Sequence, residues 1–223
     1  MTTYSATERT TPTRSAHRMA YDAETVHAIL DEALVCHLGY VVEDRPVVLP
    51  QLHVRIGSTL YLHGSTGARA LRRAREGGLP VSVTVTLVDG LVLARSHFHH
   101  SVNYRSVVAH GTATVVDDEA DKRAALAALV EHIARGRASG SRAPDRRELA
   151  ATAVLALPLV EVAAKVRTGP PVDDDEDLAL GHWAGVLPIV TVPGTPVPAP
   201  ELEPGAAVPE HVRTWARPSP LPA

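Results

Sequence analysis

The chain has 223 residues, enough for one substantial hydrophobic core, and its formal net charge is −3. This balance gives no general attraction to polyanions, and an aromatic content of 4% leaves few rings for base stacking, so we expect no nucleic-acid partner. A single cysteine, Cys36, excludes an intramolecular disulfide and a cage of thiolate ligands, and its apolar surroundings predict a core residue. No apolar run is long enough to cross a bilayer, and residues 1–20 lack the apolar centre of a signal peptide. We therefore expect no membrane partner and a cytoplasmic protein.

The first elements are an arm, a helix and three strands. Residues 1–20 lack periodicity, which predicts a flexible N-terminal arm. Asp22 is a suitable N-cap for a helix over about residues 23–34, whose apolar residues recur on one face. Alternating or Val-rich strands follow at 35–43, 46–56 and 59–64, and the short turns between them indicate an antiparallel meander.

A small-residue turn then leads into a basic helix. After Gly64-Ser65-Thr66-Gly67 the apolar spacing becomes helical, and arginines, beginning with Arg69, occupy the other faces. Hydroxyl groups, backbone amides, a helix N-terminus and an early arginine are the components of phosphate sites, so the turn is a candidate cofactor anchor. The commoner alternative is that Ser65 or Thr66 caps a surface helix whose arginines face water.

The second half of the chain alternates between strands and helices. Strands are predicted over 80–96 and 106–116, helices from 118 and over 145–151, and a last strand over 152–167 that is broken or bent at Pro158. Proline density predicts an extended extension over 191–223, fixed to the body by Trp215. Short antiparallel strands outnumber helices, which favours a mainly β (α+β) domain over 21–190, a barrel with peripheral helices.

Several segments together resemble a known family. LYLHGSTGARALRRA, VTVTLVDGLVLARSHFHHSVNYRSVVAHGTATVV and the helix start DDEADKRAAL are similar to the pyridoxamine 5′-phosphate oxidase-like family, and within it to the flavin-binding branch that includes the nitroimidazole-resistance (Nim) proteins. The resemblance covers about residues 20–190 and neither end. It implies a six-stranded antiparallel split β-barrel, and a homodimer with FMN between the two barrels.

The resemblance also implies site residues. The turn would hold the flavin phosphate, the strand Pro50–His53 would run beneath the isoalloxazine ring, and Tyr104 and Arg105 would lie near the cofactor or the dimer face. Lys165 would add positive charge near FMN or pair with acids across the dimer, and Trp183 would cover a cofactor edge or make a core or dimer contact. The implied cofactor-binding residues are Pro50, Gln51, Leu52, His53, His63, Ser65, Thr66, Arg69, Tyr104, Arg105, Lys165 and Trp183.

The implied function is an FMN-dependent oxidoreductase that acts on a small organic molecule, with reduction of nitro compounds as one option and His63 as the residue for proton transfer or substrate orientation. Two alternatives remain: a non-catalytic flavin or haem protein, and a deazaflavin-dependent reductase on the same barrel. The C-terminal arginine and histidine pattern of the true oxidases is missing, which argues against a vitamin substrate.

One histidine run, His97 to His100, raises the question of a metal. We expect none, because no carboxylate is close in sequence and no second histidine motif has ligand spacing. The acids at 173–177 are interpreted as a solvated loop, since they lack the alternating pattern of oxygen ligands.

Overall fold

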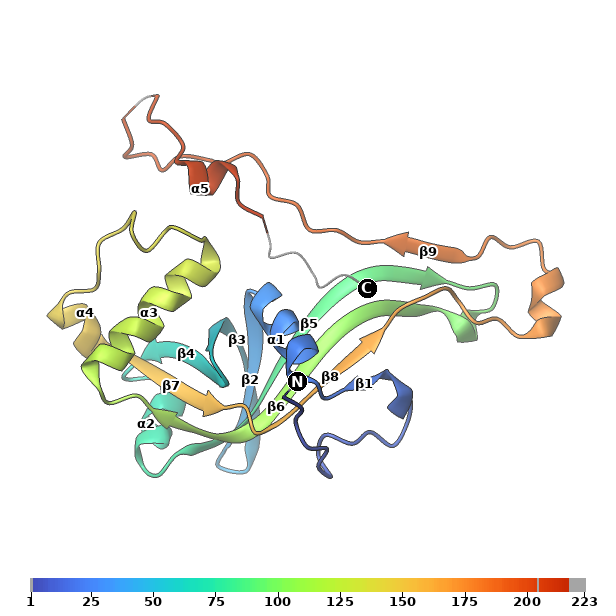
Figure 1. Cartoon of the computed structure of the whole chain (residues 1–223), viewed down its shortest axis with the longest axis horizontal. Helices are drawn as coiled ribbons and strands as arrows, with labels where there is room; N and C mark the ends of the chain where they lie inside the picture. Colours follow the sequence, from blue (N-terminus) through green and yellow to red (C-terminus); the bar gives the residue numbers. More distant parts are fainter. Residues whose placement is uncertain (1, 204, 217–223) are drawn as a thin grey trace.

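The structure is a computed structural model that describes residues 2–203 and 205–216 (Figure 1). Its strands are β1 (Met19–Ala20), β2 (Val35–Val42), β3 (Arg45–Ile56), β4 (Thr59–Ser65), β5 (Leu79–Leu93), β6 (Ser101–Val115), β7 (Thr152–Pro158), β8 (Glu161–Arg167) and β9 (Gly185–Pro188). Its α-helices are α1 (Ala23–Glu32), α2 (Arg69–Arg75), α3 (Glu119–Ile133), α4 (Arg146–Ala151) and α5 (Glu210–Arg213), and short 3-10 helices are η1 (Ala16–Arg18), η2 (His97–His99) and η3 (Asp175–Ala179).

The strands form a nine-stranded antiparallel sheet that closes on itself. The order is β1-β8-β6-β7-β4-β3-β2-β5-β9, and an additional β5–β6 pairing joins six of these strands, from β6 through β7, β4, β3 and β2 to β5, into a ring. The predicted six-stranded split barrel is therefore confirmed. Closure leaves β1, β8 and β9 as additions outside the ring.

Alternation along the strands fills the barrel with Val and Leu. In β5, Val81, Val83 and Val85 are buried while the intervening residues face outward, as the sequence predicts. Leu60 of β4 and Leu155 of β7 are similarly buried. Outside the strands, α1 buries Ile29 and Leu30, and α2 buries its alanines and Leu71 in the same core cluster. The core thus needs few aromatic rings.

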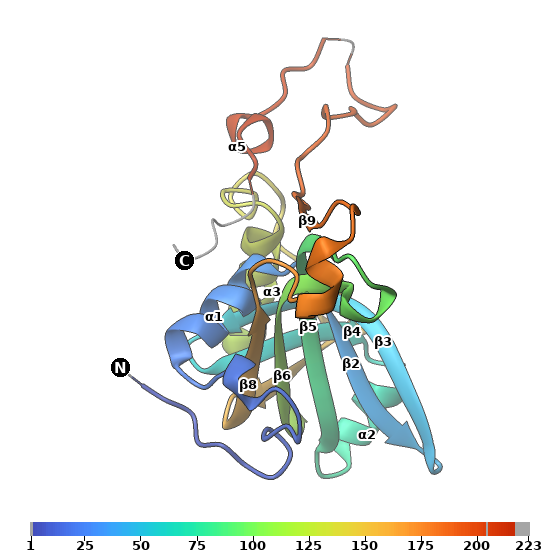
Figure 2. The ribbon, with the colours of Figure 1, turned by 90° about the vertical axis from the view of Figure 1, so that its right-hand side faces the viewer.

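Two strands are much longer than the barrel requires. β5 and β6 have 15 residues each, and their paired ends extend beyond the ring as a projection whose tip carries η2 and η3 (Figures 1 and 2). We call residues 88–104 and 168–188 the β projection. β9 pairs with its outer edge through Gly90–Leu93. Gly90 permits this approach, since a Cβ there would lie 3.2 Å from the Leu187 carbonyl oxygen.

Two sequence predictions need correction, and a third is confirmed. The strand predicted over 106–116 begins at Ser101, and the β9 strand was not predicted because it has only four residues. The segment 152–167 is broken at Pro158, as predicted. Before the break β7 pairs with β4 and the end of β6, and after it β8 pairs with an earlier part of β6.

Both ends of the described chain contact the body. Thr7 and Arg9 donate to the carboxylate of Glu161 in β8, and β1 pairs with the same strand. At the other end the indole Nε1 of Trp215 donates to the carbonyl oxygen of Ile133 at 2.7 Å, which fixes the extension to the end of α3 as predicted. The flexibility of the first 20 residues stays a prediction. Among the described residues, no helix is long and apolar enough to span a bilayer.

Candidate cofactor site

The candidate site begins where β3 and β4 separate. β4 pairs with β3 only from Thr59 to Leu62, opposite His53–Ile56, and then continues along β7. The first half of β3, from Arg45 to Leu52, pairs with β2 alone. The pairing of β3 with β4 therefore ends between Leu52 and His53 on β3 and between Leu62 and His63 on β4. The predicted ring-binding segment, Pro50–His53, and the predicted phosphate turn after β4 lie at this separation.

The turn after β4 is held by its own backbone. The Thr66 N–H donates to the Ala151 carbonyl at 2.9 Å, the Ala68 N–H to the Ser65 carbonyl at 2.9 Å, and the Gly67 N–H to the Ser65 hydroxyl at 3.3 Å. The N-cap of α2 is Ala68, which has no side-chain capping bond. The alternative that Ser65 or Thr66 caps this helix is therefore wrong. Both hydroxyl groups remain available as donors to a ligand.

The charged residues of α2, beside the turn, are all basic. Arg69 opens α2 and is exposed, three further arginines follow, and the first turn of the helix holds no acidic residue. Within the described chain, none of these arginines takes part in an ion pair, whereas nine ion pairs are formed elsewhere. A surface with donors and uncompensated cations suits a phosphate group.

His63 stands at the end of β4, two residues before Ser65. It is half-buried, and its Nδ1 is a buried polar atom without a hydrogen-bond partner in the structure. Such atoms are uncommon in folded proteins and call for an explanation. A polar ligand at the point where β3 and β4 part would supply the missing bond.

His53 has a different environment from the rest of the predicted set. It is fully buried, and its Nε2 lies 3.0 Å from the Leu30 carbonyl oxygen, while His132 Nε2 lies 2.9 Å from that of Ala33. The two imidazoles, 5.4 Å apart, thereby satisfy carbonyl groups at the C-terminal end of α1. The side chain of His53 thus supports the helix from inside the core. Contact of its neighbours Pro50, Gln51 and Leu52 with a flavin ring stays a prediction.

A pH dependence follows from His53. Burial lowers the pKa of this residue from 6.5 to about 4, although the Leu30 carbonyl opposes the shift. The unfolded chain takes up the proton near pH 6.5 and the folded chain only near 4, so stability is full above 6.5 and falls as the pH drops through this window. We expect a loss of about 3 kcal/mol. Urea unfolding between pH 7.5 and 4 should show this loss in the parent and in the exposed control His17→Gln. The variant His53→Gln should lose less stability over this pH range. If its free energy of unfolding depends on pH as strongly as that of the parent, the assignment to His53 is contradicted.

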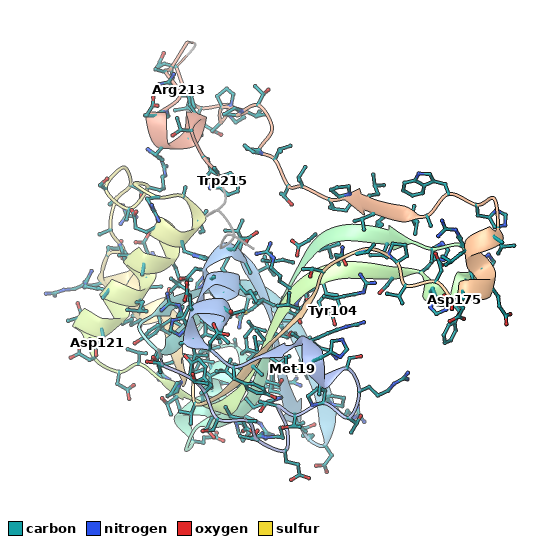
Figure 3. All side chains as sticks on the ribbon, turned by 45° about the vertical axis from the view of Figure 1, so that its right-hand side comes forward. Met19, Tyr104, Asp121, Asp175, Arg213 and Trp215 are labelled. Atoms are coloured by element: carbon teal, nitrogen blue, oxygen red, sulfur yellow. The ribbon has the colours of Figure 1, made fainter. Side chains whose placement is uncertain are left out.

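Tyr104 lies near the base of the β projection (Figure 3), and Arg105 and Lys165 are close to it in the β6–β8 pairing. Arg105 is bound by two carboxylates, those of Glu32 and Asp89. Its hydrogen bonds to Asp89 and Glu32 raise the pKa of the guanidinium, which is therefore engaged within the chain. Tyr104 and Lys165 are half-buried on the opposite face of the strands, two positions apart in the β6–β8 register.

Trp183 lies further out. Its side chain is exposed and covers Gly185, where an added Cβ would lie 2.9 Å from the indole ring. In both views of the ribbon, β8 and β9 lie on a different side of the barrel from α2 (Figures 1 and 2). One chain therefore brings His63, Ser65, Thr66 and Arg69 together and does not bring Trp183 to them.

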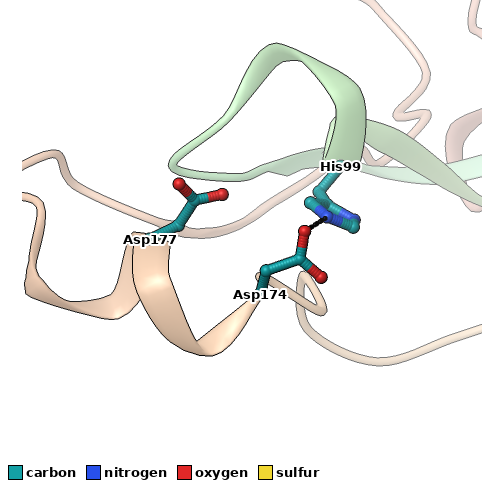
Figure 4. Close-up of side chains that lie close together, drawn as sticks. All are labelled: His99, Asp174 and Asp177. Carbon is teal, nitrogen blue, oxygen red and sulfur yellow. Dashed lines mark hydrogen bonds and ion pairs between the residues drawn. The ribbon is translucent and has the colours of Figure 1, made fainter.

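The acidic loop is more structured than the sequence suggests. Asp173 accepts bonds from the backbone N–H and guanidinium of Arg95, both at 2.8 Å, and its side chain is almost fully buried. Asp174 lies 3.1 Å from His99 Nε2, and Asp177 completes a group whose ligand atoms lie within 4.8 Å of one another (Figure 4). No carboxylate is close to His99 in the sequence, but in the folded chain two carboxylates lie beside it. His99 and Asp174 are 75 residues apart in sequence, and the pairing of β9 with β5 and the bonds from Arg95 to Asp173 bring their segments together.

Comparison with known proteins assigns the class. The family model for pyridoxamine 5′-phosphate oxidase matches residues 22–166, and the chain belongs to this family. The split-barrel fold agrees with that membership. No curated protein matches the chain.

Two solved structures match nearly the whole chain. The flavocytochrome Anf3 from Azotobacter vinelandii is 37% identical, with a TM-score of 0.88, over 96% of this chain and 99% of that one. A FAD and haem binding protein from Mycobacterium smegmatis is 40% identical, with a TM-score of 0.84, over 88% and 96%. The family match lies within residues 20–190, as the sequence indicates, and the similarity to the first of these structures extends over 96% of the chain. A structure named for 5-nitroimidazole antibiotic resistance, from Bacteroides thetaiotaomicron, is 22% identical (TM-score 0.56, 66% and 86% covered) and shows the fold alone.

Proposed function

We propose that the protein binds a flavin and a haem and works as an oxidoreductase. The observation that carries this proposal is the similarity along nearly the full chain to two proteins whose names state flavin or FAD together with cytochrome or haem. This favours FAD over the FMN that the sequence alone suggests, and it favours a flavin with haem over a deazaflavin. The chain's own residues decide whether each of these cofactors fits.

The residues present suit a flavin. Ser65 and Thr66 would donate hydroxyl groups to a phosphate and Arg69 would donate from its guanidinium, and the first turn of α2 holds no acid. A bound flavin supplies hydride transfer, and the protein supplies position and exclusion of water. His63 would hold or move a proton at Nδ1, the atom that lacks a partner among the described residues.

The residues also suit a haem, which needs a side-chain ligand for its iron. Cys36 does not meet that need, because burial raises the pKa of its thiol to about 12 and keeps it protonated. Histidines with uncommitted ring nitrogens are available among the described residues, including His63 and the exposed His37. An imidazole ligand is therefore the form of haem binding that this chain favours.

A homodimer is part of the proposal. The free edge of β3 from Arg45 to Leu52 and the exposed side chains of Val41, Val48 and Leu49 on the same hairpin form an apolar surface that a second copy would cover. Light scattering should give twice the chain mass of 23.7 kDa. A single-chain mass at micromolar concentration would contradict this part. The cytoplasmic location remains a prediction.

The activity is tested by reduction under nitrogen. We expect NADH or NADPH to bleach the flavin absorption of the loaded protein, and acid release followed by chromatography to identify FAD. Nitro compounds are the first oxidants to try, as the resemblance to the Nim branch suggests. A flavin that stays oxidised with both donors would favour the non-catalytic alternative.

A further inference from the structure

A second positive site lies on the outer face of β8. Arg167, the last residue of this strand, is only 7% exposed. Its Nη1 donates to the side-chain oxygen of Asn103 and, at 3.4 Å, to the Gly169 carbonyl, while its Nη2 reaches the Pro170 carbonyl at 3.5 Å. Its Nε is buried and has no partner. All its acceptors are neutral, and the guanidinium charge is thus buried without a carboxylate.

This situation is unusual within the molecule. Three partly buried arginines, whose side chains are 18% to 27% exposed, each bind an acid: Arg55 binds Asp31, Arg95 binds Asp173, and Arg105 binds Glu32 and Asp89. Burying an uncompensated charge costs several kcal/mol, so folded chains normally pair it. The structure supplies no such pair for Arg167 from the described residues.

The surrounding charges have the same sign. Lys165 lies two residues earlier on the same face of β8 and forms no ion pair in the described chain. Its register partner Met19 directly follows Arg18, which brings η1 beside this face. Burial and then the charge of Arg18 lower the pKa of Arg167. Arg18 and Arg167 therefore repel each other, and Lys165 adds a third positive charge to the same face of β8.

We propose that Arg167, Lys165 and Arg18 form an anion site that takes a phosphate or carboxylate group of a small ligand. Tyr104, opposite Arg167 in the β6–β8 register, adds a hydroxyl donor, and Figure 3 shows Tyr104 and Met19 near each other at the base of the β projection. Three cations call for more than one negative charge. A phosphate or a dicarboxylate meets this demand better than one acidic side chain of a partner subunit.

This site is separate from the phosphate turn of the same chain. The turn precedes α2, whereas β8 and β1 lie on another side of the barrel in both ribbon views (Figures 1 and 2). The inference does not rest on the flavin proposal. Arg69→Ala should leave the second site intact, so failure of one assignment is distinguishable from failure of the other.

The test is calorimetric binding of inorganic phosphate and of succinate to the full chain at fixed ionic strength. We expect Arg167→Gln to weaken binding at least about tenfold and Lys165→Gln about threefold, because each removes a charge-assisted contact. Arg147→Gln, the same charge change on the exposed surface of α4, should have no effect. If Arg167→Gln does not fold, Lys165→Gln still tests the site, because Lys165 is only partly buried.

The outcomes separate the sources of the anion. If FMN, FAD or haem also loses affinity in the Arg167 and Lys165 variants, that cofactor's acidic group occupies the site. If only phosphate or succinate loses affinity, a free small anion does. Absence of binding by the parent protein, or binding that neither variant weakens, would overturn the proposal. So would variants that loosen only the subunit association, because the counter-charge would then be a partner's carboxylate.

Discussion

Replacing Arg69 by Ala is expected to weaken flavin binding about 10- to 100-fold, the loss of a charge-assisted bond to phosphate. The fold should not change, because the Arg69 side chain is exposed and the buried face of α2 consists of Ala70, Leu71 and Ala74. Fluorescence titration of the apoprotein with FAD and FMN measures the effect.

The matched control for Arg69 lies in the same helix. Arg75 is also exposed, but it is in the last turn, away from Ser65 and Thr66. Arg75→Ala should therefore bind flavin like the parent. Equal weakening by both substitutions would mean that the helix acts only through its overall charge. Full affinity in Arg69→Ala would refute the phosphate assignment of the turn.

Replacing Arg105 by Ala should destabilise the protein by about 3 kcal/mol. Its guanidinium joins Glu32, at the end of α1, to Asp89, at the bulge where the β projection begins. The Glu32 side chain is 9% exposed, so the substitution leaves a nearly buried carboxylate without a counter-charge. Urea unfolding at pH 7 measures the loss.

Two further variants check the explanation for Arg105. Arg105→Ala combined with Glu32→Gln should recover part of the stability, because the unpaired charge is removed. Arg123→Ala, which breaks an ion pair whose side chains are 39% and 70% exposed, should change stability by no more than about 0.5 kcal/mol. A loss below about 1 kcal/mol for Arg105→Ala, or no recovery in the double variant, would contradict the role of this network.

The local patterns of the sequence predict most of the barrel. Alternation in β5, the capping by Asp22 and the small-residue turn after β4 are set by neighbouring residues, and each appears in the structure. The change of partner at Pro158 and the short strand β9 depend on strands far away in the chain. No local period contains this information, so the break at Pro158 was predicted but not the partners on its two sides, and β9 was missed.

The site could be predicted in part for the same reason. Ser65, Thr66 and Arg69 follow one another within a single turn, so their grouping is visible in the sequence. The carboxylates that engage Arg105 come from α1 and β5, and the acids beside His99 come from a segment 75 residues away. Such long-range contacts decide whether an arginine forms an ion pair with an acid, as Arg105 does, or, like Arg167, has no acidic partner among the described residues.

The absorption spectrum of the purified protein, recorded after gel filtration with and without added FAD, FMN and haem, tests the central claim most directly. We predict that flavin bands and a Soret band both remain with the protein fraction. A protein that emerges colourless after incubation with all three would contradict the proposed function.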